Sequence, residues 1–238
     1  MENSLTYEIK RKLSLASKIL SKKILKTVSI FEETFGVPQW RRKDPLDELM
    51  LTILSQNTND RNRDNAYHKL RAQFPTWEKV MQADVELIEG AIRSAGLSKQ
   101  KSKNMKNALL WINDYFGDLS LDKIRSLSDD EAIELLTSQK GVGIKTAAVM
   151  LAFSLDRDLC PVDTHVHRIA LRLGWVREKT NAVNTFKLLR VAMPRGKAAT
   201  FHLNLLRFGR EICNARSPKC GGCPLFEVCK WKGRHDFK

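Results

Sequence analysis

The sequence has no long uninterrupted apolar segment. Its longest nearly apolar stretch runs over residues 147–155 and is interrupted by Ser154. A membrane-spanning helix needs about 20 consecutive apolar residues, so we expect no transmembrane segment. The N-terminal region is charged and amphipathic, with neither the apolar core nor the small-residue cleavage site of a secretory signal. We therefore expect a soluble, intracellular protein, located in the cytoplasm or nucleoid, or in the nucleus if the organism is a eukaryote.

Glycine, proline and acidic residues are all scarce. The 238 residues include 12 Gly and 7 Pro, with no flexible linker, internal repeat or low-complexity tract, and this length allows one large or two small domains. Asp and Glu number 27 against 41 Lys and Arg, which gives a net charge of +14. That excess favours a polyanionic partner, most of all nucleic acid. Charge alone leaves an anionic membrane surface and simple solubility as alternatives.

Apolar residues recur at steps of three and four, which is the period of an α-helix, and no alternating strand pattern is present. The pattern Ser128-x-x-Glu131 before an apolar run predicts a capping box at a helix start. Helix ends are predicted at five glycines, namely Gly36, Gly96, Gly117, Gly141 and Gly174. The fold class is therefore predicted to be all-α, with about ten helices joined by short turns.

Four of the five cysteines lie in one short segment near the C-terminus, with the spacing C-x6-C-x2-C-x5-C. They are Cys213, Cys220, Cys223 and Cys229. An intracellular compartment disfavours disulfides, and a tetrahedral zinc site usually uses two close cysteine pairs, of which this segment has one. A [4Fe–4S] cluster accepts four separated thiolates, so the spacing favours it over zinc, with free thiols as a further alternative. Cys160, outside this segment, is predicted to be a buried thiol.

A glycine-containing turn follows the capped helix. Residues 135–151 are interpreted as two helices joined through Gly141-Val142-Gly143, the second beginning near Lys145. Such a turn presents backbone N–H groups at a helix N-terminus, which attract phosphate, while Val142 is expected to pack into the core. An ordinary helical hairpin is the alternative. The positive charge and the adjacent Lys145 and Thr146 favour binding of a DNA backbone.

Lys145 and Asp163 are the candidate catalytic pair. Asp163 follows Pro161 and precedes an apolar helical run, so it is also a natural N-cap. Lys145 is also compatible with a solvated or phosphate-binding role. A helix and a return turn would bring the two together, and a partly desolvated lysine near a helix N-terminus loses its proton more readily. It would then form a Schiff base with a sugar carbon.

These motifs together resemble the endonuclease III family, DNA glycosylase/AP lyases of the helix-hairpin-helix superfamily. The segments 141–147, 162–165 and 213–229 resemble the family in order and spacing. Further upstream, residues 54–60 resemble the loop that plugs the gap left by a flipped base, and residues 95–97 resemble the turn whose leucine wedges between bases. The resemblance implies these DNA-binding residues: Gln56, Asn57, Leu97, Lys140, Gly141, Val142, Gly143 and Thr146.

The resemblance also implies an architecture and a partner. Residues 1–39 would form an N-terminal helix that packs with a cluster domain, residues 40–151 a six-helix barrel with the hairpin at about 129–151, and residues 152–238 the cluster domain. A monomer would bind double-stranded DNA with a damaged base or abasic site in the cleft between the domains. Lys145 would attack the sugar as a damaged, pyrimidine base leaves, and Asp163 would stabilise the positive sugar.

Some positions depart from the family pattern. The residues before the first glycine are Gln139 and Lys140 instead of the usual Leu-Pro, and the plugging position holds Asn57 instead of the frequent glutamine. Two alternatives stay open: a monofunctional mismatch or methyl-base glycosylase on the same fold, and a non-catalytic DNA-binding module. A run of lysines after the wedge turn fits both a solvated face and a DNA contact. It comprises Lys99, Lys101, Lys103 and Lys106.

Overall fold

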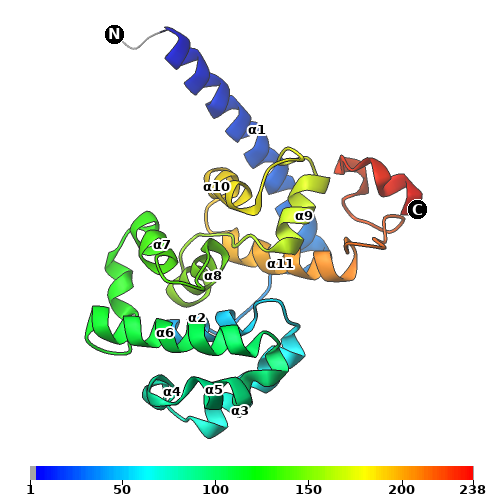
Figure 1. Cartoon of the computed structure of the whole chain (residues 1–238). Coiled ribbons are helices and arrows are strands. Elements are labelled where there is room, and N and C mark those ends of the chain that lie inside the picture. Colours follow the sequence, from blue (N-terminus) through cyan, green and yellow to red (C-terminus); the bar gives the residue numbers. More distant parts are fainter. Residues whose placement is uncertain (1–3, 238) are drawn as a thin grey trace. The chain divides into compact units, whose positions relative to one another are not determined.

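The structure is a computed structural model that describes residues 4–237, with side chains described from residue 17 onward. Residues 1–3, which the sequence analysis placed in the N-terminal helix, lie outside the described residues. Within residues 4–237 the chain forms eleven α-helices and four short 3-10 helices, without a β-strand (Figure 1). The predicted all-α class is thereby confirmed. None of the described helices combines the length and the apolarity needed to cross a membrane.

The chain divides into two compact units. One contains the described residues up to Trp40 together with Asp158 and those that follow it, and the other spans Arg41–Arg157. This second unit contains the whole of the helix Ile144–Leu155. The last four residues of that helix are all buried, and their burial stabilises its C-terminal turn.

The first unit is built on the long first helix. Its helices are α1 (Ser4–Phe35), α9 (Thr164–Arg172), α10 (Ala182–Ala192), α11 (Ala198–Glu211), η3 (Phe226–Val228) and η4 (Lys232–Phe237). The C-terminal half of α1 packs against α10 and α11. There the Phe31 ring lies 5.0 Å from the ring of Phe208 and 5.8 Å from that of Phe201. Aromatic pairs at such distances contribute more than their buried area alone, so they fix α1 on α11.

The second unit surrounds an apolar helix. Its helices are α2 (Pro45–Leu54), α3 (Asp60–Gln73), α4 (Trp77–Gln82), α5 (Val85–Ile92), η1 (Arg93–Ala95), α6 (Ser98–Phe116), η2 (Asp122–Ser126), α7 (Asp129–Thr137) and α8 (Ile144–Leu155). Every residue of α8 from Thr146 to Leu155 is buried, which is typical of a helix enclosed by its neighbours. It packs against α2 and α7.

The predicted helix-end signals are present in the structure. At the start of α7 the Ser128 hydroxyl accepts from the Glu131 N–H at 3.3 Å, and the Ser128 N–H donates to the Glu131 carboxylate at 2.8 Å. This confirms the capping box, and the bond from Ser128 lowers the pKa of the Glu131 carboxyl. All five glycines predicted to end helices have a positive φ, a conformation that is costly for residues with a side chain.

Candidate functional site

The glycine turn between α7 and α8 is bonded to the loop that follows α2 in the same unit. The side-chain amide of Gln56, in the loop after α2, donates to the Gly141 carbonyl oxygen at 3.0 Å and to the Thr146 hydroxyl at 3.4 Å. Val142 is only 5% exposed, which confirms that it packs into the core. The turn is therefore fixed by the bonds of the Gln56 amide and by the packing of Val142. The predicted DNA-binding residue Gln56 thus directs its amide group toward the protein.

The N-terminus of α8 has no side-chain cap. Its N-cap residue is Gly143, which has no side chain to accept a bond, so the first N–H groups of the helix lack the partner that a capping side chain supplies. Lys145 is the second residue of this helix and is half-buried, while Thr146 is buried. The structure thus places the candidate nucleophile at the start of the helix that the sequence predicted.

The loop tips that were expected to enter DNA are exposed. Asn57 follows α2, and Leu97 stands between η1 and α6; the leucine is 54% exposed. Both have a left-handed backbone, with φ of 51° and 50°, in which residues other than glycine are uncommon. An exposed leucine in a strained conformation is typical of a functional position more than of a packing one.

A groove of about 640 Å³ links the Leu97 turn to the hairpin within the second unit. It is lined by Leu97, Ser98, Lys99, Gln100, Lys103, Asn104, Asn107 and Lys140. Its three lysines are exposed, and no acidic residue lines it. This lining favours an anionic ligand such as a nucleic-acid backbone.

Asp163 belongs to the other unit and caps α9. Its Oδ1 accepts from the Val166 N–H at 2.8 Å, and the residue is half-buried. The predicted N-cap is therefore confirmed. His165, two positions later, lies against Gly209 and has its Nδ1 3.0 Å from the Arg168 guanidinium, so it serves packing. The described capping bond uses one carboxylate oxygen of Asp163 and orients the group.

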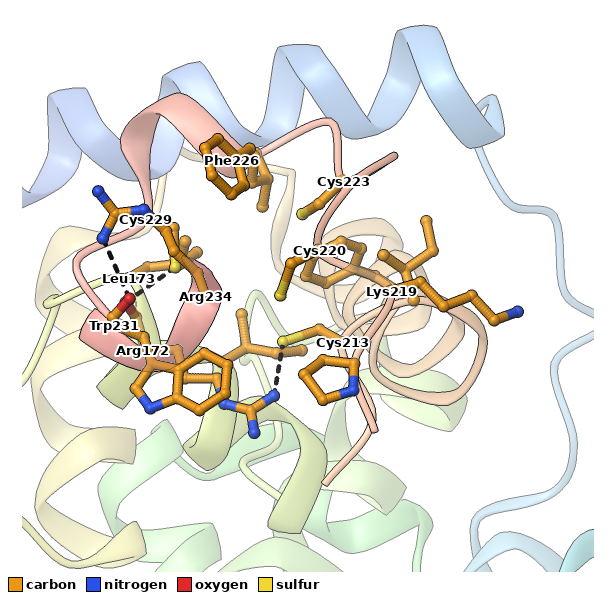
Figure 2. A pocket seen from close by; sticks show the side chains of 15 residues that line it. Arg172, Leu173, Cys213, Lys219, Cys220, Cys223, Phe226, Cys229, Trp231 and Arg234 are labelled. Carbon is orange, nitrogen blue, oxygen red and sulfur yellow. Dashed lines mark hydrogen bonds between the residues drawn. The ribbon is translucent and has the colours of Figure 1, made fainter. Parts of the chain in front are cut away.

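The four C-terminal cysteines line one cavity, and their sulfur atoms surround it (Figure 2). All four are free thiols, as is Cys160, which is 2% exposed as predicted. The Arg172 guanidinium donates to the Cys213 sulfur at 3.2 Å and stacks 4.1 Å from the Trp231 ring. The cavity therefore presents four sulfur donors beside a fixed positive charge.

Two thiols of this cavity, those of Cys220 and Cys223, have a raised pKa. Desolvation raises the pKa of Cys223 to about 11 and also raises that of Cys220, and in both cases the neighbouring thiols add to the shift. Metal ligation needs thiolates, so a positively charged group must stabilise them. Among the side chains that the structure describes, no three from His, Cys, Asp or Glu are arranged to hold a single metal ion.

Two features were missed by the sequence analysis. Arg168 and Arg172 lie one turn apart on α9 and bind the segment that starts at Cys213, since Arg168 donates to the Cys213 carbonyl oxygen at 2.8 Å. Their spacing of four residues, which places both side chains on one face of a helix, was the signal available in the sequence. Lys101, interpreted from the sequence as a solvated or DNA-contacting residue, is instead 2% exposed. Nothing in the run of lysines distinguishes it from its neighbours.

The chain is similar in sequence to known proteins. Residues 50–195 match the family described as HhH-GPD superfamily base excision DNA repair protein. A protein of Arabidopsis thaliana named as a candidate DNA glycosylase is 38% identical over 191 residues, which cover 76% of this chain and 64% of that protein. The chain thus spans somewhat under two thirds of the length of this relative.

Bacterial relatives match over more of their length. Endonuclease III of Bacillus subtilis is 31% identical over 196 residues, covering 82% of this chain and 85% of the relative. Endonuclease III of Thermotoga maritima is 30% identical over 194 residues, with coverages of 82% and 86%. The solved structure of a trapped endonuclease III–DNA covalent intermediate superposes with a TM-score of 0.79 at 27% identity, over 92% of this chain and 99% of that one.

Proposed function

The chain belongs to the endonuclease III family of the HhH-GPD superfamily, whose members are base excision repair DNA glycosylases, and from this premise we propose that it is bifunctional. It removes a damaged pyrimidine from double-stranded DNA and then cleaves the strand as an AP lyase. The observation that carries this proposal is Lys145, an amine at the second position of a helix whose N-terminus has no side-chain cap. A glycosylase that only removes the base does not need an amine there.

The chemistry follows from the two candidate residues. The Lys145 amine attacks the C1′ atom as the bond from C1′ to the base breaks, and the base leaves with a proton. The C1′–O4′ bond then breaks and O4′ takes up a proton, so the opened sugar is held on Lys145 as a protonated Schiff base whose C2′ proton is acidic. Loss of that proton breaks the bond between C3′ and the 3′ phosphate oxygen, and hydrolysis then frees the lysine. Asp163, oriented by its capping bond, stabilises the positive charge that develops on the sugar.

DNA binding is proposed for the elements around the hairpin. The uncapped N–H groups of α8 are suited to one phosphate, and the lysines of the adjoining groove are suited to others. Asn57 and Leu97 fit the roles of plug and wedge because both are exposed at loop tips. An enzyme that acts on a base must take it out of the stack, and residues at such tips fill the space that the base leaves.

We further propose that Cys213, Cys220, Cys223 and Cys229 hold a [4Fe–4S] cluster. All four line one cavity, and a cubane binds each of four separated thiolates at its own corner. When bound, the cluster supplies a rigid cross-link for the loop of residues 213–229. Arg172 supports it by donating to the Cys213 sulfur, an interaction that orients this ligand from outside the ligand set.

Borohydride trapping tests the proposed chemistry. The wild-type protein should form a covalent adduct with a damaged-base duplex and with an abasic duplex, whereas Lys145→Gln should bind both duplexes and trap neither. Lys79→Gln removes one exposed positive charge from α4 of the same unit and should trap normally. Asp163→Asn should fold, since asparagine also caps helices, and should lose most base excision while retaining some cleavage of the abasic duplex. An adduct that persists in Lys145→Gln would place the nucleophile elsewhere.

A further inference from the structure

Lys101 is a buried cation whose side-chain partners are neutral. The residue is 2% exposed, and its ammonium donates to the carbonyl oxygens of Leu54 at 2.7 Å and of Ala95 at 2.8 Å. Buried lysines are rare unless they are paired. Its position is therefore set by these two backbone groups.

Both carbonyl groups belong to the last residue of a helix. Leu54 is the last residue of α2, and Ala95 is the last residue of η1. The carbonyl groups at a helix C-terminus lack intrahelical donors and carry partial negative charge. The other three terminal carbonyls of α2 receive bonds from Ser55 and Gln56, so the Lys101 ammonium supplies the partner for the fourth.

The two helix ends lead directly into the two exposed tips. Asn57 lies three residues after Leu54, and Leu97 lies two residues after Ala95. The backbone N–H of Lys101 also donates to the Leu97 carbonyl oxygen at 3.0 Å. Lys101 is thus bonded to the residue from which each loop starts and to the wedge leucine itself. Both tips have the left-handed backbone that needs such support.

We propose that Lys101 is a positioning residue that fixes Asn57 and Leu97 relative to each other, so that plug and wedge enter a DNA duplex together when a nucleotide is flipped. This inference rests on the proposed function for its consequence in DNA. Its physical basis lies within one unit of the protein. Lys101 itself touches neither base nor phosphate, because its ammonium is enclosed and bound to the chain.

The chain offers a matched control on the same helix. Lys106, also on α6, donates to the Ala83 carbonyl oxygen at 2.7 Å, directly after the end of α4. Neither tip follows that carbonyl group. Lys101→Met and Lys106→Met each remove one lysine from α6, with its bonds to helix-end carbonyls, and keep a long apolar side chain. They differ in whether those carbonyls support the tips.

Amide hydrogen exchange on the full-length protein tests the coupling without DNA. The N–H groups of Gln56 and Gly96 donate to the carbonyl oxygens of Ile53 and Arg93, at the helix end before each tip, so they report each loop separately. Lys101→Met should accelerate exchange at both by roughly ten-fold or more, because bonds from a charged donor are lost. Lys106→Met should leave both at the wild-type rate. Unchanged exchange in Lys101→Met, or acceleration in one loop only, would overturn the proposal.

A second measurement follows flipping through the fluorescence of 2-aminopurine placed opposite an abasic site or beside a damaged base. Lys101→Met should reduce the flipping equilibrium constant by roughly ten-fold, with the salt dependence of DNA affinity unchanged. A lysine that contacted phosphate would instead lower the slope of log K against log salt by about 0.9, and that result would overturn the proposal. Lys106→Met should flip like the wild type.

The two measurements separate this inference from the function on which it rests. If the wild-type protein gives no fluorescence change with any duplex, the proposed function has failed, while the exchange rates still decide whether Lys101 couples the loops. If Lys101→Met does not fold, Lys101→Gln replaces it in both measurements. Its shorter amide cannot span both carbonyls, so the same acceleration in both loops is expected and wild-type exchange would again contradict the proposal.

Discussion

Gly141 lies so close to Asn104 that there is no space for a side chain at position 141. A Cβ atom on Gly141 would lie 2.3 Å from Nδ2 of Asn104, and the φ of Gly141 is 93°. Both the contact and the backbone conformation therefore require glycine. Because Asn104 is buried on α6, this contact fixes the hairpin against the helix that begins just after the wedge turn.

Gly141→Ala should therefore destabilise the protein by about 2 kcal/mol or more, through left-handed strain and displacement of Asn104. Gly143→Ala is the matched control, since Gly143 has a φ of −88° and open space where its Cβ would be. It should cost less than about 1 kcal/mol, the size of an N-cap effect. Urea unfolding of the two variants checks this, and equal losses would refute the assigned role of the contact.

The groove lysines should contribute to DNA affinity through phosphate alone. Each of Lys99→Gln, Lys103→Gln and Lys140→Gln should make the slope of log K against log salt shallower by about 0.9 if the lysine neutralises one phosphate. Lys79→Gln should leave the slope unchanged. Binding titrations of an undamaged duplex at several salt concentrations measure this. A slope that stays at the wild-type value in all three variants would exclude the groove as a phosphate site.

The cysteine cavity should give a coloured protein. Cys220→Ser or Cys223→Ser should remove the visible absorption of an iron–sulfur cluster and increase protease sensitivity within residues 213–229. Cys160→Ser should keep the absorption because Cys160 does not line the cavity. Absorption spectra and metal analysis of anaerobically purified protein decide the matter. A colourless protein with one equivalent of zinc would contradict the cluster.

The burial of Lys101 should also make the free energy of unfolding depend on pH. Burial lowers the pKa of its ammonium from 10.5 to about 8. Between these values the unfolded chain binds more protons than the folded one, so the contribution of Lys101 to the free energy of unfolding rises with pH across this window. The difference in unfolding free energy, wild type minus Lys101→Met, should therefore grow from pH 8 to pH 10. A difference that falls over this range would show that the ammonium is stabilised in its site.

Local signals in the sequence predicted local structure well. The capping box at Ser128, the five glycine helix ends and the N-cap at Asp163 all depend on residues a few positions apart, so their geometry is set by the nearby chain. The end of α8 was less predictable. Pro161 indicated a break, yet the helix ends earlier, at Leu155, where Asp156 adopts a left-handed backbone. An aspartate at that position carries no strong signal.

Features that depend on distant segments were not accessible from the sequence. The burial of Lys101 results from carbonyl groups at two other helix ends, one of them 47 positions away. The amide of Gln56 binds a turn 85 positions later, so its direction could not be inferred from its own loop. In both cases polar side chains in a plausible DNA-binding segment are used to hold the protein together.

The enclosure of α8 determines how mutations elsewhere should affect activity. Because residues 146–155 are all buried, this helix cannot rotate or slide without disrupting its surroundings, and Lys145 stands at its first turn. The amine is thus part of a rigid assembly, while Asn57 and Leu97 lie on loops. Substitutions that change which lesion is accepted should therefore fall in the loops, where they leave the nucleophile in place. Substitutions around α8, even remote ones, should appear as loss of turnover and loss of fold together.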